Sequence, residues 1–78
     1  MPYQTPPSDL VALGHSADTI EAAMATGSGD EDTLGTIARN IAHIRTMCAR
    51  EDIIALGESL AGFLATADEG EAYLVAHT

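Results

Sequence analysis

The stretch LGTIARNIAHIRTMC, residues 34–48, repeats apolar side chains at intervals of three and four positions. At about 100° of turn per residue, most of these side chains fall within roughly 80° of a helix surface. Such a narrow stripe is typical of a helix that packs on one side only. The stretch therefore predicts a helix over residues 30–49 with one buried face, formed by Leu34, Ile37, Ile41, Ile44 and Cys48.

An acidic run, GDEDTLG at residues 29–35, stands at the beginning of this helix. A calcium loop of the helix–loop–helix type requires oxygen ligands at its fifth and twelfth positions, but both positions counted from Asp30 hold hydrocarbon side chains. Ser28 and Glu31 instead have the spacing of a capping box, and carboxylates stabilise the positive end of a helix. We therefore expect the run to start a helix and not to bind a metal ion.

A second helix is predicted before this one, over residues 8–25. Its apolar stripe consists of Leu10, Leu13, Ala17, Ile20 and Met24. Gly14 costs about 1 kcal/mol relative to alanine inside a helix, so the helix has a weak point near residues 14–18 at which it could kink or split. Residues 1–7 hold three prolines and no periodic pattern, which predicts a flexible N-terminal arm followed by a single helical domain over residues 8–78.

A third helix is predicted over residues 52–67, after a tight turn around residues 49–52. Its large apolar side chains are Ile53, Leu56, Leu60, Phe63 and Leu64. Gly57, Ala61 and Ala65 recur every four positions and add a second face of small side chains. Because a helix that is apolar on nearly all sides is normally buried, we expect this one at the centre of the fold or in a subunit interface.

Asp68 and Glu71 have the spacing of an acidic capping box, which predicts a separate short helix over residues 72–76. The sequence as a whole predicts an all-α fold, a small bundle of three main helices plus this short C-terminal helix. Short connections favour antiparallel neighbours. A chain of 78 residues has a marginal core, and the apolar stripes exceed what one small bundle requires. We therefore expect a homodimer whose interface is formed by Ile53, Leu56, Leu60, Phe63 and Leu64.

The charges are strongly segregated along the chain. Arg39, Arg45 and Arg50 are the only Lys or Arg residues, and six acidic residues lie before Arg39 and six after Arg50, giving a net charge of -9. Such a charge repels phosphate backbones, so direct nucleic-acid binding is not expected. One interpretation is that acidic helices flank and neutralise the arginine-rich one. The other is that Arg39, His43 and Arg50 form an outer face that binds an acidic partner protein or a second copy of the chain.

No motif predicts catalysis, a metal or a cofactor. His15, His43 and His77 are far apart in sequence and lack the paired spacing of zinc ligands. Cys48 lies on the apolar stripe and is expected in the core. The serines stand in no nucleophile elbow, and Gly27 and Gly29 are followed by carboxylates that would repel phosphate. Catalytic residues are therefore not assigned.

The N-terminal segment does not have the pattern of a signal peptide, and the longest nearly apolar run, residues 53–67, is too short and too polar to span a bilayer. These features predict a soluble, cytoplasmic protein without a membrane partner. The leading hypothesis for function is a non-enzymatic protein–protein interaction module, an adaptor, inhibitor or regulatory subunit, one version of which mimics the charge of a nucleic acid. The alternatives are a phosphotransfer domain that uses His43 and a structural component of a homo-oligomeric assembly.

Overall fold

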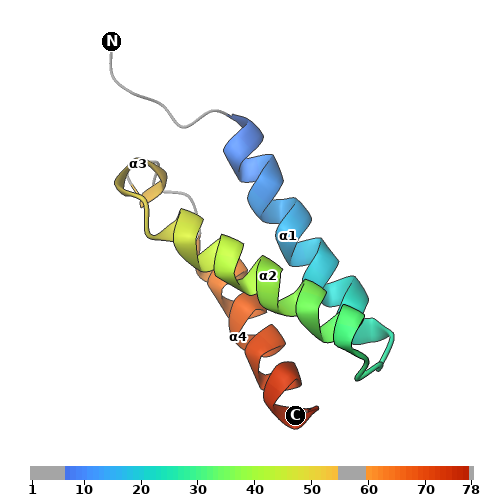
Figure 1. Cartoon of the computed structure of the whole chain (residues 1–78). Helices are drawn as coiled ribbons and strands as arrows, with labels where there is room; N and C mark the ends of the chain where they lie inside the picture. Colours follow the sequence, from blue (N-terminus) through green and yellow to red (C-terminus); the bar gives the residue numbers. More distant parts are fainter. Residues whose placement is uncertain (1–6, 55–59, 78) are drawn as a thin grey trace.

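The fold was analysed in a computed structural model, which describes residues 7–54 and 60–77 (Figure 1). The regular structure in these ranges is helical and consists of α1 (Pro7–Ala25), α2 (Glu31–Cys48), α3 (Glu51–Ile54) and α4 (Ala61–Ala76). Helices α1, α2 and α4 each contact the other two, whereas the single turn α3 contacts α2. The prediction of an all-α fold with three main helices is confirmed. The predicted flexible arm, apart from Pro7, lies outside the described residues.

Helix α1 runs through Gly14 without a break, so the weak point predicted from that glycine does not interrupt it. It ends where Gly27 takes a φ of 70°, a left-handed conformation that glycine adopts without a steric cost. The amides of Thr26 and Gly27 donate hydrogen bonds to the carbonyls of Ala23 (3.2 Å) and Met24 (3.1 Å). This turn reverses the chain and lays α2 against α1.

Helix α2 begins as expected at the acidic run, but with a different cap. The carboxylate of Asp30 accepts a hydrogen bond from the amide of Thr33 at 2.7 Å, and the hydroxyl of Ser28 donates to the same carboxylate at 2.7 Å. The Thr33 amide, helped by Ser28, lowers the pKa of Asp30. The predicted capping box of Ser28 and Glu31 is therefore wrong, because Asp30 is the residue that caps the helix.

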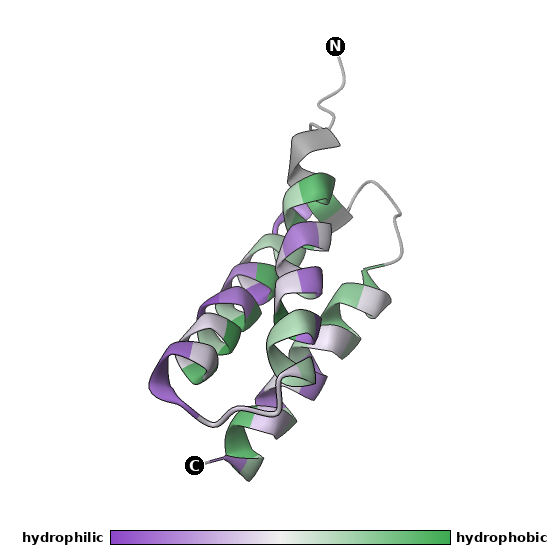
Figure 2. Ribbon diagram, turned by 90° about the vertical axis from the view of Figure 1, so that its right-hand side faces the viewer, coloured by the Kyte–Doolittle hydropathy of each residue, from purple (hydrophilic) through white to green (hydrophobic). Residues whose placement is uncertain are grey.

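The C-terminal part of the chain differs most from the prediction. A helix was expected over residues 52–67 and a second, short helix over 72–76. Instead α4 is one continuous helix from Ala61 to Ala76. Asp68 and Glu71 do not cap a new helix, because their carboxylates bind Arg45 of α2. Figure 2 shows that α4 is pale or green along most of its length, whereas α2 is purple on its outer side.

The three long helices, together with α3, enclose one core. It is formed by Leu13, Ala17, Ile20, Ile37, Ile41, Ile44, Met47, Cys48, Ile53 and Ala67. The stripe predicted on α2 is confirmed, with Leu34 at its end only partly buried. Cys48 is a core residue as expected, and its burial raises the pKa of the thiol.

At Gly70, α4 lies close to both of the other long helices. A methyl group built on it would lie 3.1 Å from Ile20 of α1, and 3.2 and 3.1 Å from Ile37 and Ile41 of α2. Gly70 and the fully buried Ala67 therefore form the small-residue contact of this helix. The small face predicted from Gly57, Ala61 and Ala65 does not form this contact. Ala61 and Ala65 are exposed, and Gly57 lies outside the described residues.

Candidate interaction surface

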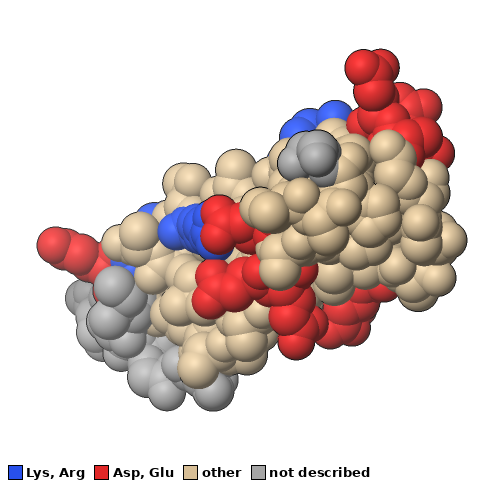
Figure 3. Space-filling model, turned by 90° about the horizontal axis from the view of Figure 1, so that it is seen from below, with Lys and Arg blue, Asp and Glu red and all other residues tan. Residues whose placement is uncertain are grey.

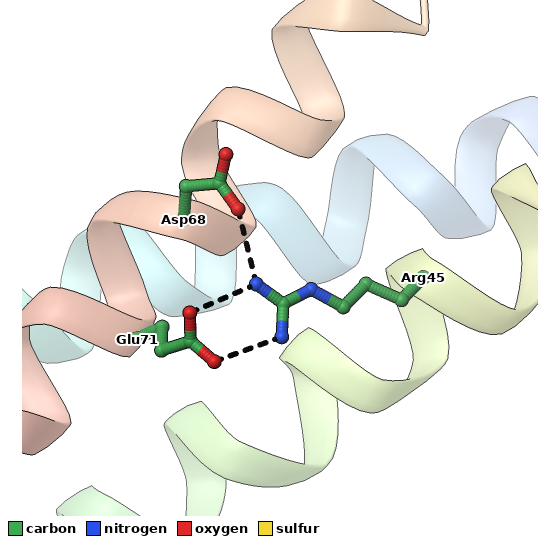
Figure 4. A network of polar contacts seen from close by, with 3 residues as sticks. All are labelled: Arg45, Asp68 and Glu71. Atoms are coloured by element: carbon green, nitrogen blue, oxygen red, sulfur yellow. Dashed lines mark hydrogen bonds and ion pairs between the residues drawn. The ribbon is translucent and has the colours of Figure 1, made fainter.

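One arginine joins α2 to α4 (Figure 4). Arg45 places Nη2 3.0 Å from Oδ1 of Asp68 and Nη1 3.1 Å from Oε1 of Glu71, and Nη2 also donates to Oε2 of Glu71 at 3.3 Å. The hydrogen bonds from Arg45 and its positive charge lower the pKa of Glu71. The hydrogen bonds to Glu71 and Asp68, together with their negative charges, raise the pKa of the guanidinium. All three side chains reach solvent, so the contact fixes the register of α4 against α2 more than it stabilises the fold.

The third acidic side chain of α4, Glu69, is not paired in this way. Gly70 faces α1 and α2 together, and Glu71 turns from it toward α2. Glu69 precedes Gly70 by about 100° of helix rotation, so it projects toward the α1 side. The interpretation that carboxylates neutralise the arginine-rich helix is confirmed for Arg45 but does not extend to Glu69, which makes no ion pair within the described residues.

Helix α1 places two more carboxylates on this side. Ser16 of α1 faces α2, where its hydroxyl meets His43. Glu21 is about 140° around the helix from Ser16 and follows Ile20, the residue that packs on Gly70. Glu21 and Glu69 therefore lie at the same level of the α1–α4 side, with Asp18 one turn away on α1.

We call Asp18, Glu21 and Glu69 the α1–α4 acidic face; all three residues are exposed. None of them forms an ion pair in the part of the chain that the structure describes. Figure 3 shows acidic atoms in several groups, at the upper right, along the lower edge and beside the basic atoms near the middle, while basic atoms occupy only small areas of that view. Its charges repel one another and have no counter-ion among the described residues, an arrangement that favours contact with a cationic surface.

The predicted partner-binding residues lie on two different parts of α2. Arg39 and His43 are exposed and one turn apart, and Arg39 donates to the hydroxyl of Thr36 at 3.3 Å. His43 is held toward α1, because its Nδ1 lies 2.6 Å from Oγ of Ser16. Arg50 is exposed in the turn after α2. A partner at these three residues stays a prediction, and the chain places only Arg39 and His43 side by side.

The predicted oligomer interface is largely taken up by the chain's own core. Ile53 is 0% exposed in the single chain, and Leu60 and Phe63 are partly buried against the core. Leu64 is 39% exposed, whereas Leu56 lies outside the described residues. Among the four described residues of this set, Leu64 is the most exposed, and the homodimer stays a prediction.

Within the described residues, no three His, Cys, Asp or Glu side chains are grouped so as to hold a metal ion. None of the described helices combines the length and the apolar character needed to cross a bilayer. Comparison with known proteins finds no protein-family model, curated protein or solved structure that matches the chain. The assignment of function therefore rests on the geometry of this molecule.

Two contacts that position these surfaces were not predicted. The pairing of Arg45 with Asp68 and Glu71 had a signal in the sequence, because carboxylates three apart on a helix share a side and can both reach one guanidinium. The contact of Ser16 with His43 had no signal in the sequence, because it joins two helices whose orientation about their own axes depends on core packing.

Proposed function

We propose that this protein is a non-enzymatic interaction module whose α1–α4 acidic face binds a basic protein. The observation that supports this most is the unequal use of its carboxylates. Asp68 and Glu71 are bound by Arg45, whereas Asp18, Glu21 and Glu69 are exposed without a described ion pair. A partner rich in lysine or arginine would relieve the repulsion among them and would be attracted over a distance by the net charge of -9.

One version of this function is a mimic of nucleic-acid charge, in which the carboxylates occupy the place of phosphates on a basic host protein. Its binding should weaken as salt rises, since exposed charges more than about 10 Å apart are screened at 0.1 M ionic strength. A nucleic acid should displace the protein from such a host. A complex that persists at high salt would exclude the mimic.

The acidic face is tested with paired variants that remove the same charge. Glu21→Gln/Glu69→Gln changes the face, and Glu31→Gln/Asp32→Gln changes the exposed first turn of α2 by the same two units. Binding to a lysine- and arginine-rich peptide is measured by fluorescence anisotropy, after circular dichroism has shown that both variants are folded. We expect the first pair to weaken binding roughly three- to tenfold, the effect of about two exposed charge pairs.

The second pair should leave the affinity close to that of the wild type. Equal losses in both pairs would show that only the total charge matters and would overturn the assignment of the face. Affinity that does not change between low and high salt would overturn the electrostatic basis of the proposal.

We propose that the protein acts in the cytoplasm. We also propose that it forms a homodimer, and that the interface is the exposed part of α4 that includes Leu64. The support for the dimer is the apolar character of α4 on its outer side, where Ala61, Ala65 and Ala72 are exposed. Light scattering at low and high salt tests this: a dimer at both salts supports it, and a monomer at both contradicts it.

A further inference from the structure

Two of the three histidines are held through Nδ1: that of His77 lies 2.9 Å from the carbonyl oxygen of Tyr73 on its own helix, whereas that of His43 contacts a side chain of another helix, Ser16 of α1. Ser16 is 6% exposed, and its Oγ lies 2.6 Å from Nδ1 of His43, while His43 itself is exposed. The ring is thus anchored on α1 through one nitrogen. Its other nitrogen, Nε2, lies on the opposite edge of the ring.

We propose that Nε2 of His43 is a phosphoryl acceptor site that takes its phosphoryl group from an acyl phosphate. The role of Ser16 follows from its hydroxyl, which both donates and accepts hydrogen bonds. When Nδ1 carries the proton and donates it to Oγ of Ser16, Nε2 keeps its lone pair and is the nucleophile. An ionised carboxylate, which accepts but does not donate hydrogen bonds, could hold the ring only while Nδ1 carries a proton.

In the transfer, the Nε2 lone pair attacks phosphorus and a nitrogen–phosphorus bond forms. The bond between phosphorus and the acyl oxygen breaks, and its electron pair leaves on the carboxylate. The ring then loses the Nδ1 proton to water, and the hydroxyl of Ser16 turns to donate to Nδ1. The hydroxyl therefore holds the ring in the same orientation before and after the transfer.

Arg39 provides a charge for the incoming phosphate. It lies one turn before His43 on α2, and its guanidinium points toward the N-terminus of the helix, where Nη2 donates to the hydroxyl of Thr36 at 3.3 Å. From this position its charge attracts the phosphate, and a direct hydrogen bond to a phosphate oxygen requires the guanidinium to leave Thr36. The sequence from Thr33 to Arg50 contains no carboxylate that would repel the phosphate.

The test is labelling of the full chain with acetyl phosphate. Intact mass at neutral pH counts the phosphoryl groups, and phosphorus NMR distinguishes the Nε2 from the Nδ1 isomer. His15 is the internal control, because it is an exposed histidine of α1 with no described ring contact. We expect His43 to be labelled at Nε2 roughly tenfold faster than His15, the effect of about one charge-assisted hydrogen bond.

Substitutions separate the roles of the three residues. His43→Ala should abolish the fast label, and His15→Ala and His77→Ala should keep it. Arg39→Gln should slow labelling, with partial recovery in Arg39→Lys. Ser16→Ala should yield a mixture of Nε2 and Nδ1 isomers, whereas Ser16→Thr, which keeps the hydroxyl, should restore the Nε2 isomer. Equal labelling of all three histidines, a dominant Nδ1 isomer at His43, or a fast label that survives His43→Ala would each overturn the proposal.

Discussion

Helices α2 and α4 have similar lengths, but the sequence of α2 indicates which side of the helix is buried much more clearly than the sequence of α4 does. α2 alternates a buried stripe with a charged outer face, so its amino acids indicate which side is inside. α4 is apolar around most of its circumference, and only Thr66, Ala67 and Gly70 are buried in it. The orientation of α4 is set by Gly70, because α1 and α2 come too close to this position to leave room for a side chain. Periodicity therefore predicts a helix such as α2 well and a helix such as α4 poorly.

The largest expected effect comes from filling the contact at Gly70. In Gly70→Ala the new methyl group must displace Ile20, Ile37 and Ile41 together, each at 3.1 or 3.2 Å. Overpacking of this kind costs about 1–3 kcal/mol, partly offset by the higher helix propensity of alanine. Chemical denaturation should show a lower free energy of unfolding. An unchanged or higher stability would mean that α4 does not pack at this residue.

A smaller loss is expected from Tyr73→Phe, which releases the C-terminal end of α4. The hydroxyl of Tyr73 donates to the carbonyl of Ser28 at 2.5 Å, and its ring stacks on His77 with centroids 4.0 Å apart. Removing one such hydrogen bond costs about 0.5–1.5 kcal/mol. The midpoint of thermal unfolding should fall while the helix content at 25 °C stays constant, and an unshifted midpoint would show that this contact does not hold the loop.

Gly14→Ala is the matched control for Gly70→Ala and should change stability in the opposite direction. Both glycines lie inside long helices, but a methyl group on Gly14 meets nothing within 4 Å. Alanine should therefore stabilise α1 by about 0.5–1 kcal/mol. If the two variants are equally destabilised in denaturation experiments, the difference in packing between the two sites is not real.

The smallest effect concerns the contact of Arg45 with Glu71, and it depends on pH. The pKa of Glu71 is lower in the folded chain than in the unfolded chain, so the contribution of the ion pair is present above the unfolded pKa and is lost as pH falls through the folded one. Glu71→Gln should unfold at a slightly lower temperature than the wild type at pH 7. The two unfolding temperatures should converge as the pH falls below about 4. A constant difference at all pH values would contradict this account.

The sequence was sufficient for the fold class, for the core face of α2 and for the helix start at the acidic run. The predicted break between two helices near Asp68 was wrong. Asp68 and Glu71 have the spacing of a capping box, but the same spacing allows both to bind an arginine on a neighbouring helix. Ile53 was assigned to a subunit interface because its burial inside the chain depends on tertiary packing. The α1–α4 acidic face also depends on tertiary packing, because its residues share a side only once the orientation of each helix about its own axis is known.

Residue-level hydrogen exchange of α4, followed by NMR in the isolated chain, tests the central claim most directly. The acidic face exists only if α4 continues through Asp68 and packs Gly70 against α1 and α2. We expect the amides from Ala67 to Glu71 to exchange as slowly as those of Ile41 and Ile44 in α2. Fast exchange that begins at Asp68 would show two separate helices, and it would remove Glu69 from the side of Glu21 on which the proposed function depends.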